Sequence, residues 1–572
     1  MSKNRSNLNI APEDILIPGL DHGLRLVRDE SLDTGRIPPI KLDFLSLSPE
    51  IEHRISTYRA MWKNDTWIKS ATFPTVLAVA DSVSFSRGTM TIGGKFLLNS
   101  APGARLRTRI SQNNRELSEA ISDHLTELSF SNTKAPEVYQ GEWKDLDLVI
   151  EAKNFFNYYH FVKEALPNLT LYQQYDLQGK VVFCGVGSKI STFVHELCKT
   201  WFPSIYDRIE FRIGNDRPDY DRALIPFNTM HLYFQTRRQV MSPIEDVGAR
   251  VPRRASPENF GTVANNSCEA PLLNLRETVR QALAPSTNEK RRLYVTRKSS
   301  RVRRVVGEEI LISKLSRLGF ECISFEDLSI REQAQTVSEA EMIVSIHGAG
   351  MTNMLFADPG CRVIELSNLQ TLRKRFGDFN PLAIASGVHY CHVFLDHDFD
   401  DATIVPNISR DGHRGVVIDD FRAKVIASWI GHLLDPEQSE SIRLKCSEIN
   451  ETRDFSALHH LLSKDADKIY HIPDTHVWLA NCLNDMKMKD ESLAPLRRAL
   501  VLAPRRVPLQ KRILDLASLL NDREGFEEAR KHLRRFSEAE YVKLFKERGW
   551  PTEDIPDGQI AEKDAKISIL RN

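Results

Sequence analysis

The pattern of hydrophobic and polar positions changes several times along the chain. Short apolar or β-branched runs occur at Val76–Val83, Thr89–Ile92 and Lys95–Leu98, and the glycine-containing pairs Arg87-Gly88 and Gly93-Gly94 interrupt them. Runs of this length between tight turns predict a small antiparallel sheet.

From about residue 145 the pattern becomes one of strands alternating with helices. The apolar runs Leu148–Ala152 and Val181–Cys184 predict buried strands. The amphipathic stretch Tyr158–Tyr175 between them predicts a helix. The polar, turn-rich segment Val251–Ala270 then predicts a linker between two α/β regions.

The most regular α/β pattern lies between residues 271 and 434. The expected elements are strand Leu293–Thr296, helix Glu308–Leu318, strand Phe320–Phe325, helix Ser329–Ser338, strand Met342–Ile346, strand Val363–Leu366 and a final helix Asp419–Leu434. Strands that alternate with helices in this way predict a parallel, doubly wound sheet.

After residue 437 no strand pattern remains, and the sequence is polar and helical. Small and apolar residues fall near the spacing of a 34-residue tetratricopeptide unit, at Leu479, Ala480, Leu483, Leu496, Ala499 and Pro504. A plain bundle of helical hairpins explains the same pattern nearly as well. Both alternatives predict a helical region that could receive a protein partner.

Composition narrows the class of protein. The 572 residues include 77 Lys+Arg and 77 Asp+Glu, which gives a formal net charge of zero. A dedicated nucleic-acid binder usually has a basic excess, so we expect no nucleic-acid partner. No apolar run approaches the roughly 18 residues of a membrane span, and the N-terminus lacks the apolar core of a secretory signal. These features, with eight scattered cysteines and no CxxC pair, predict a cytoplasmic protein.

A glycine-rich segment follows the predicted strand that ends at Ile346. It reads His347-Gly348-Ala349-Gly350-Met351-Thr352-Asn353 and leads into a short helix. Glycines let the backbone approach a bulky anion, and free N–H groups at a helix start suit a phosphate. A turn that serves folding alone remains the alternative, because neither the Walker pattern nor the full dinucleotide-binding pattern is present. Glu365, at the end of the next strand, is a candidate for binding ribose hydroxyls, and the alternative is a simple helix cap or salt bridge.

A basic segment lies at the end of another strand of the same predicted sheet. The sequence from Arg291 to Arg304 reads RRLYVTRKSSRVRR, and its strand ends near Arg297. Open α/β sheets bind ligands at the carboxyl ends of their strands. Guanidinium groups there could bind a diphosphate through paired hydrogen bonds. A solvated basic loop is the alternative by composition alone.

A third candidate lies in the segment Asn154–Pro167. His160 and Glu164 are four residues apart on the predicted helix and share one face. A histidine oriented by a carboxylate is a candidate general base. An ordinary pair on a helix surface is the alternative that spacing alone favours.

Taken in order, these segments resemble glycosyltransferase family 61. The resemblance rests on NFFNYYHFVKEALPNL, YVTRKSSRVRRVVGEE, LSIREQ, AEMIVSIHGAGMTNMLFADPG and RVIELSN, and it covers roughly residues 75–400. It implies an α/β protein of the GT-B type, with a pair of facing Rossmann-like domains. It also implies an inverting transferase that uses nucleotide sugars, commonly uridine diphosphate sugars, and needs no catalytic metal or other cofactor.

The resemblance also implies roles for individual residues. His160 would be the catalytic base with Glu164 as its orienting partner, or Glu164 would be the base itself, and Asn157 would lie on the acceptor side. Glu332-Gln333 are interpreted as structural. The donor-binding set would comprise Arg297, Arg304, His347, Gly348, Ala349, Gly350, Thr352, Asn353 and Glu365. The triplet Asp145-Leu146-Asp147 is the competing metal motif of a different transferase class, but no further pattern of that class supports it, so no metal site is predicted.

The expected organisation has four parts. Residues 1–140 would form a lead-in with a small β-rich segment, and 141–255 an N-terminal Rossmann-like acceptor domain. Residues 271–434 would form a C-terminal Rossmann-like nucleotide-sugar domain, and 437–572 a helical, tetratricopeptide-like region.

The resulting functional hypothesis is transfer of a sugar from a nucleotide-sugar donor to a hydroxyl of a glycan acceptor, in surface-polysaccharide biosynthesis. A non-catalytic nucleotide-sugar-binding scaffold that recruits partners through its helical tail is the alternative. Another enzyme on Rossmann-like domains, such as a sugar isomerase, fits the order of the segments less well.

Overall fold

The computed structural model describes residues 10–49, 51–53, 67–131, 135–228, 267–284, 290–298, 303–399 and 404–550. The chain divides into two compact units. The α/β unit comprises Met1–Leu45 and Arg59–Val417, and the helical unit comprises Ser46–Tyr58 and Ile418–Asn572. Most of the predicted linker, residues 251–266, and Arg301 of the basic segment lie outside the described residues.

The first half of the α/β unit is built on an eight-stranded sheet of order β6-β5-β4-β10-β7-β8-β9, with β1 paired to β4. Its strands are β1 (Leu24–Leu26), β4 (Thr75–Ser86), β5 (Thr89–Ile92), β6 (Lys95–Phe96), β7 (Leu148–Ala152), β8 (Val181–Gly185), β9 (Ile209–Ile213) and β10 (Tyr220–Asn228). The antiparallel β4–β5–β6 meander is confirmed. It is one edge of this larger sheet, whose β10, β7, β8 and β9 run parallel.

The second half is built on another eight-stranded sheet, of order β11-β3-β2-β17-β16-β15-β12-β14. Its strands are β2 (Gly35–Ser46), β3 (Trp67–Phe73), β11 (Ser267–Glu269), β12 (Arg291–Thr296), β14 (Phe320–Ser324), β15 (Ala340–Ile346), β16 (Arg362–Ser367) and β17 (His389–Phe394). The four predicted strands, now β12, β14, β15 and β16, run parallel, and β17, which the pattern did not predict, pairs in parallel with β16. A short pair, β13 (Val305–Val306) with β18 (Val416–Val417), lies apart from it.

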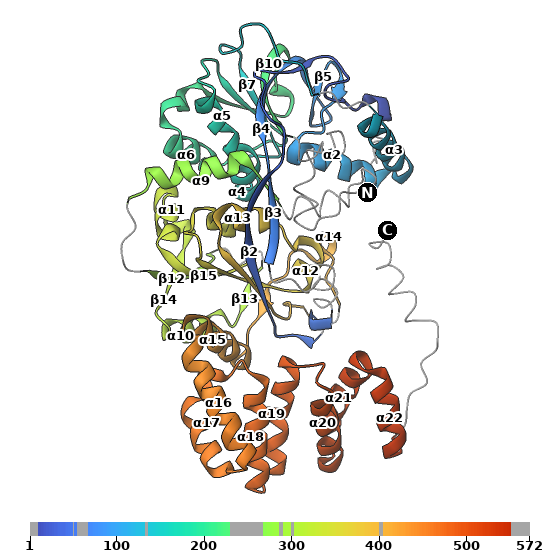
Figure 1. Ribbon diagram of the computed structural model, residues 1–572, viewed down its shortest axis with the longest axis vertical. Coiled ribbons are helices and arrows are strands. Elements are labelled where there is room, and N and C mark those ends of the chain that lie inside the picture. The colour runs from blue at the N-terminus through green and yellow to red at the C-terminus, as the bar shows by residue number, and fades with distance from the viewer. Residues whose placement is uncertain are drawn as a thin grey trace. The chain divides into compact units, whose positions relative to one another are not determined.

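The first 140 residues differ from the expected separate lead-in. Strands β2 and β3 extend the second sheet, whereas β4, β5 and β6 extend the first. Only Pro74 separates β3 from β4, so the chain passes from one sheet directly into the other there (Figure 1). Apolar alternation identifies these strands but not their neighbours, since pairing partners are distant in sequence.

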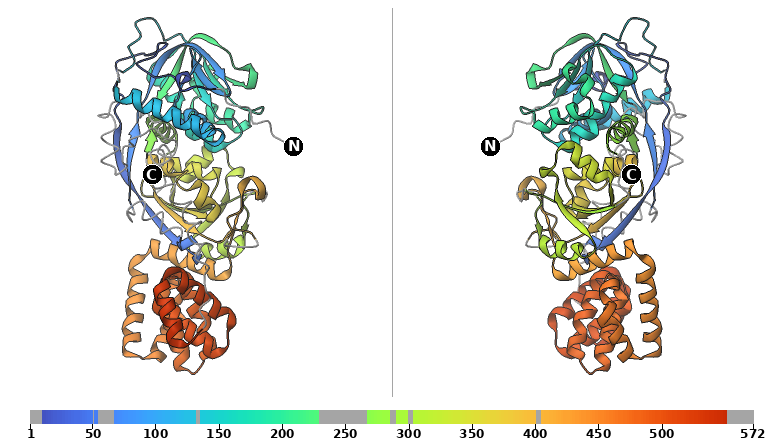
Figure 2. Two further views of the ribbon diagram at one scale, coloured as in Figure 1. Left: turned by 90° about the vertical axis from the view of Figure 1, so that its right-hand side faces the viewer. Right: turned by 90° about the vertical axis from the view of Figure 1, so that its left-hand side faces the viewer.

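Helices cover both sheets and fill the space between them. They are α2 (Ser100–Asn113), α3 (Arg115–Ser131), α4 (Tyr158–His160), α5 (Leu169–Gln174), α6 (Thr192–Trp201), α9 (Ala270–Ala282), α10 (Glu308–Ser316), α11 (Ile330–Ser338), α12 (Leu369–Arg375), α13 (Asn380–Ser386) and α14 (Ile408–Asp411). Helix α9 lies between the two sheets and contacts elements of both halves (Figures 1 and 2). One hydrophobic core joins Leu148 and Phe161 of the first half to Met351 and Leu355 of the second.

The helical unit contains helices packed as successive neighbours. They are α15 (Asp420–Leu434), α16 (Pro436–Thr452), α17 (Phe455–Ile469), α18 (Pro473–Asp485), α19 (Lys489–Leu502), α20 (Val507–Leu520), α21 (Arg523–Phe536) and α22 (Glu538–Arg548). The pairs α18–α19 and α20–α21 make the most extensive contacts. The all-helical character is confirmed, and the tetratricopeptide interpretation stays a prediction. Helix α15, expected in the preceding domain, groups with this unit. Across the described ranges, no helix is both long and apolar enough to cross a bilayer.

Candidate active site

The His160 segment begins just beyond the carboxyl end of β7, at the edge where parallel strands commonly present ligand-binding groups. Asn157 is the N-cap residue of α4, and its side chain accepts a hydrogen bond from the backbone N–H of His160 at 3.3 Å. The segment is not the single α-helix that the sequence predicts. After α4 it continues as a π-helical turn, Phe161–Ala165, and then as a 3-10 turn, Leu166–Asn168. Pro167 has no N–H to donate, which interrupts a regular α-helical ladder.

The structure brings His160 and Glu164 together despite this irregular backbone. Nδ1 of His160 lies 2.7 Å from Oε1 of Glu164, and both side chains are mostly buried. Arg105, from α2, donates to the other carboxylate oxygen of Glu164 at 2.6 Å. Burial raises the pKa of Glu164, but the charges of Arg105, His160 and Lys163 outweigh it and lower the pKa to about 2. Glu164 is therefore a firmly ionised partner that favours the Nδ1–H form of His160.

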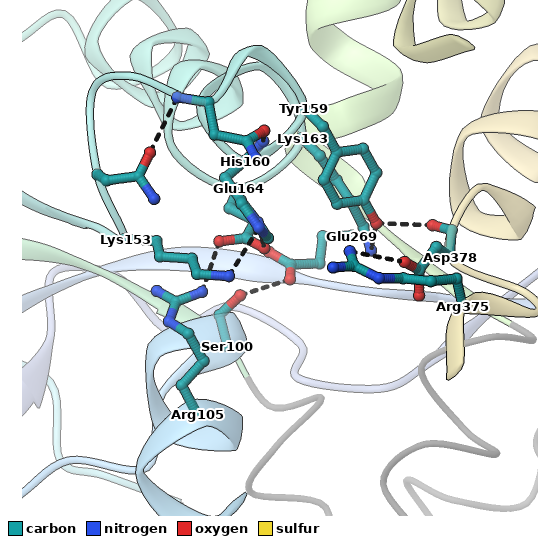
Figure 3. Close-up of polar contacts among 12 residues, drawn as sticks. Ser100, Arg105, Lys153, Tyr159, His160, Lys163, Glu164, Glu269, Arg375 and Asp378 are labelled. Carbon is teal, nitrogen blue, oxygen red and sulfur yellow. Dashed lines mark hydrogen bonds and ion pairs between the residues drawn. The ribbon is translucent and has the colours of Figure 1, made fainter. Parts of the chain in front are cut away.

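The second ring nitrogen of His160 also has a partner. Nζ of Lys153, the first residue after β7, lies 2.7 Å from Nε2 of His160. Burial lowers the pKa of Lys153, and the charges of Arg105 and Arg375 lower it further against the opposite effects of Glu164 and Asp378. Figure 3 shows Lys153, His160, Glu164 and Arg105 converging from three segments of the chain. Lys153 and Arg105 were not among the residues that the sequence predicts for the site.

A third carboxyl group lies beside this cluster. Glu269, at the end of β11, accepts a hydrogen bond from the hydroxyl of Ser100. Burial and the nearby Glu164 raise the pKa of Glu269 to about 7, against the lowering effect of Ser100 and Lys163. Glu164 and Glu269 line a small internal cavity of about 30 Å³, which has room for one or two water molecules.

The glycine segment follows β15, and the chain enters a 3-10 helix, Ala349–Phe356, after Gly348. Gly348 is needed here for a close approach: a Cβ at this position would lie 3.1 Å from Nη1 of Arg297. That Nη1 is buried and has no hydrogen-bond partner within the part of the chain that the structure describes. A buried guanidinium nitrogen against a glycine turn is a donor suited to an anionic ligand.

Arg303, which is not among the predicted donor-binding residues, joins Arg297. Its Nη1 donates to the carbonyl oxygen of His347 at 3.3 Å, and Nη2 lies 3.3 Å from Nδ1 of His413. Burial, with the charges of Arg375 and Arg297, lowers the pKa of Arg303 to about 10. Arg297, Arg303 and Arg375 together form a cationic cluster, in which the charges of Arg375 and Arg297 both act on Arg303. Arg304 instead forms an ion pair with Asp398 at 3.3 Å, and its side chain is 59% exposed.

The contacts of Glu365 favour a different role from the ribose contact that the resemblance implies. Its side chain is almost completely buried, and Oε1 accepts from Nδ1 of His347 at 2.8 Å and from Ser367 at 2.5 Å. The hydroxyl of Tyr390 donates to Oε2. Burial raises the pKa of Glu365, but His347 and His392 outweigh it and lower the pKa to about 2. Glu365 thus positions His347 beneath the glycine turn.

Asn353 and Thr352 are also buried rather than open to a ligand. Oδ1 of Asn353 accepts from the hydroxyl of Tyr158 at 2.6 Å, and its Nδ2 donates to Gln333 at 2.9 Å. Thr352 is fully buried. The structural interpretation of Glu332-Gln333 is confirmed, because Glu332 forms a capping box with Ser329 at the start of α11.

Two tyrosines beside His160 connect the halves of the α/β unit. Tyr158 bonds Asn353 of the glycine segment, and the hydroxyl of Tyr159 donates to the carbonyl oxygen of Asp378 at 2.6 Å. Asp378 in turn lies 3.5 Å from Arg375 of the cationic cluster. The candidate base is therefore linked to Arg375 of the cationic cluster through Tyr159 and Asp378 (Figure 3).

The competing metal motif has a structural role in this fold. Oδ1 of Asp147 accepts a hydrogen bond from the backbone N–H of Lys180 at 3.0 Å, which joins two neighbouring strand starts. Within the described ranges, no three His, Cys, Asp or Glu side chains are grouped as metal ligands.

A family model matches the part of the chain that contains most of this site. The protein is a glycosyltransferase, because residues 158–364 match the family model described as Glycosyltransferase 61. The matched segment starts inside the His160 segment and ends one residue before Glu365. The chain thus carries a glycosyltransferase family 61 domain, and the resemblance drawn from its ordered motifs is confirmed.

No curated protein matches the chain. Among solved structures, it is similar to one titled "Crystal structure of MamA", with 12% sequence identity and a TM-score of 0.17. That similarity covers 23% of this chain and 80% of the other.

Proposed function

We propose that the protein is an inverting glycosyltransferase that transfers a sugar from a nucleotide-sugar donor to a hydroxyl of a glycan acceptor. The donor is a uridine diphosphate sugar, and the two halves of the α/β unit act as the facing domains of a GT-B enzyme. We further propose that the reaction belongs to surface-polysaccharide biosynthesis. The observation that carries the proposal is that the His160–Glu164 segment is joined to the glycine segment through Tyr158 and Asn353, and to Arg375 of the cationic cluster through Tyr159 and Asp378.

The reaction is a single displacement at the anomeric carbon. The acceptor hydroxyl gives its proton to Nε2 of His160, and its oxygen forms the new bond to the anomeric carbon. The bond between that carbon and the diphosphate oxygen breaks, and its electron pair leaves with the diphosphate. Because attack occurs opposite the leaving group, the anomeric configuration inverts. Glu164, held ionised by Arg105, stabilises the imidazolium that forms.

The cationic cluster acts on the leaving group. Arg297 and Arg303 lie against the glycine turn, where donors are fixed before the reaction begins. Fixed donors in a partly dehydrated site stabilise charge that develops in the transition state. Three guanidinium groups supply enough positive charge for a diphosphate, so we propose that the reaction needs no metal ion.

The contacts distinguish the two candidates for the base. Both carboxylate oxygens of Glu164 are already bound, and its pKa of about 2 makes it a weak base. His160 keeps a lone pair at Nε2. These contacts favour His160 as the base and Glu164 as its orienting partner.

The test is release of nucleotide by the full-length protein. We expect incubation with uridine, guanosine and cytidine diphosphate sugars, each with a panel of glycan acceptors, to release a nucleoside diphosphate from one donor class. NMR of the product should show the anomeric configuration opposite to that of the donor. Retention of configuration would contradict the single displacement. Binding of a nucleotide sugar without turnover under any acceptor would favour the non-catalytic scaffold.

A second expectation concerns the cationic cluster. Arg297→Ala and Arg303→Ala should each weaken binding of uridine diphosphate about tenfold to a hundredfold, because each removes a charged hydrogen-bond donor worth about 1.5–3 kcal/mol. Isothermal titration calorimetry measures the change. Arg304→Ala is the matched control, since Arg304 is exposed and pairs with Asp398. Equal losses in all three variants would mean that a general electrostatic effect, rather than a formed diphosphate site, binds the nucleotide.

A further inference from the structure

The contact between Lys153 and His160 blocks the ring nitrogen that the proposed base would use. Nε2 of His160 must accept the proton of the acceptor hydroxyl, yet Nζ of Lys153 lies 2.7 Å from that nitrogen. Nδ1 is engaged by Glu164, so no second lone pair is available on the ring. An acceptor hydroxyl therefore reaches Nε2 only after Lys153 has moved.

The surroundings of Lys153 supply a reason for it to move. Its side chain is partly exposed at the end of β7. Arg375 and Asp378, from the other half of the unit, lie close enough to shift its pKa, as does Arg105. Arg375 belongs to the cationic cluster, whose members also repel one another. Arg375 and Glu164 thus act on the ammonium group of Lys153 in opposite directions.

The balance of charge changes when a diphosphate binds. Without an anion, Arg375 of the cationic cluster repels the ammonium group of Lys153, which favours the position of that group beside His160 and Glu164. A bound diphosphate neutralises the cluster and offers oxygens that a lysine on a flexible four-carbon stem can reach. The same ammonium then gains a charged hydrogen bond on the donor side.

We propose that Lys153 is a catalytic residue that covers Nε2 of His160 until the donor binds, and then turns to the donor diphosphate and frees that nitrogen for the acceptor hydroxyl. Lys153 gains no proton and loses none in this step; its N–H contact passes from Nε2 to a phosphate oxygen. The base therefore becomes available only when a nucleotide sugar is already in place. This inference rests on the proposed function and adds to it a group that links the donor and acceptor sides.

The inference predicts how Lys153 and His160 affect nucleotide binding. Isothermal titration calorimetry with uridine diphosphate would be carried out on the full-length wild type, Lys153→Met, His160→Ala and the double variant. Lys153→Met should weaken binding about tenfold, since a charged contact to the diphosphate is lost. His160→Ala should strengthen binding about threefold, because Lys153 no longer has to leave a partner first. The double variant should bind like Lys153→Met, since the gain depends on the lysine.

The controls separate this role from a structural one. Lys153→Arg keeps the charge and the reach and should restore the affinity to within about threefold of wild type. Lys144→Met removes a lysine that pairs with Asp176 on the surface and should leave the affinity unchanged. Wild-type affinity in Lys153→Met, or a gain from His160→Ala that persists in the double variant, would overturn the inference alone. If the wild type binds none of the three nucleotides uridine, guanosine and cytidine diphosphate, the result contradicts the proposed function and, with it, the role of Lys153.

Discussion

Replacement of His160 by alanine is expected to lower kcat of sugar transfer by about a hundredfold to ten thousandfold, the usual contribution of a general base. The variant removes the ring nitrogen proposed to take the acceptor proton, while Arg297 and Arg303 remain in place. Uridine diphosphate should therefore bind at least as tightly as to wild type. The loss should appear in single-turnover kinetics with saturating donor, which isolates the chemical step from product release.

His195→Ala is the matched control for this variant. His195 lies on the surface of α6, where its ring contacts Phe211 and Nδ1 lies 3.2 Å from the hydroxyl of Tyr206. Its loss should change kcat less than about threefold, as expected of a surface substitution. If His160→Ala turns over at the wild-type rate with a good acceptor, the base is another group. Glu269, whose pKa is raised to about 7, would then be the first alternative to replace.

The sequence predicts the parallel part of the second sheet well, because each strand there is a short apolar run between amphipathic helices. Strands β12, β14, β15 and β16 lie within a residue or two of their expected bounds. It does not predict that β2 and β3 join this sheet. Their partners are far away in the chain, and hydrophobic alternation alone carries no information on which strands pair.

The site is predicted where its members are close in sequence. His160 and Glu164 share one short segment, so their contact can be inferred from spacing, even though a π-helical turn replaces the expected α-helix. Arg105 comes from a helix 59 residues away and has no local signal. Lys153 does have a local signal, because it is the first residue after a buried strand, at the edge where parallel sheets bind ligands.

The choice between neighbouring residues also depends on the folded backbone. Arg303 and Arg304 are neighbouring residues of the same type, yet Arg303 is half-buried against His347 whereas Arg304 pairs with Asp398 at the surface. The direction of each side chain follows from backbone angles that the sequence does not show. Arg303 has a φ of 59°, in the left-handed region that non-glycine residues seldom adopt. Residues in such conformations are often found at functional sites.

The second large effect is expected at Glu365, as a loss of stability. Glu365→Gln should lower the free energy of unfolding of the α/β unit by about 3 kcal/mol at pH 7, because it removes a buried charge that His347, Ser367 and Tyr390 all contact. Urea unfolding followed by tryptophan fluorescence measures the change. Glu321→Gln is the matched control. Glu321 pairs with Arg291, but its side chain is 48% exposed, so about 0–1 kcal/mol is expected.

The pH dependence of this effect has a definite sign. The pKa of Glu365 is lowered from 4.5 to about 2 in the folded protein, so the folded state binds the proton less readily than the unfolded state. Its stabilising contribution is therefore fully present above about pH 4.5 and is lost as the pH falls toward 2. The gap between wild type and Glu365→Gln should narrow across this window. A gap that stays constant would show that Glu365 acts through the shape of its hydrogen bonds rather than its charge, and that His347 needs no anionic partner beneath the glycine turn.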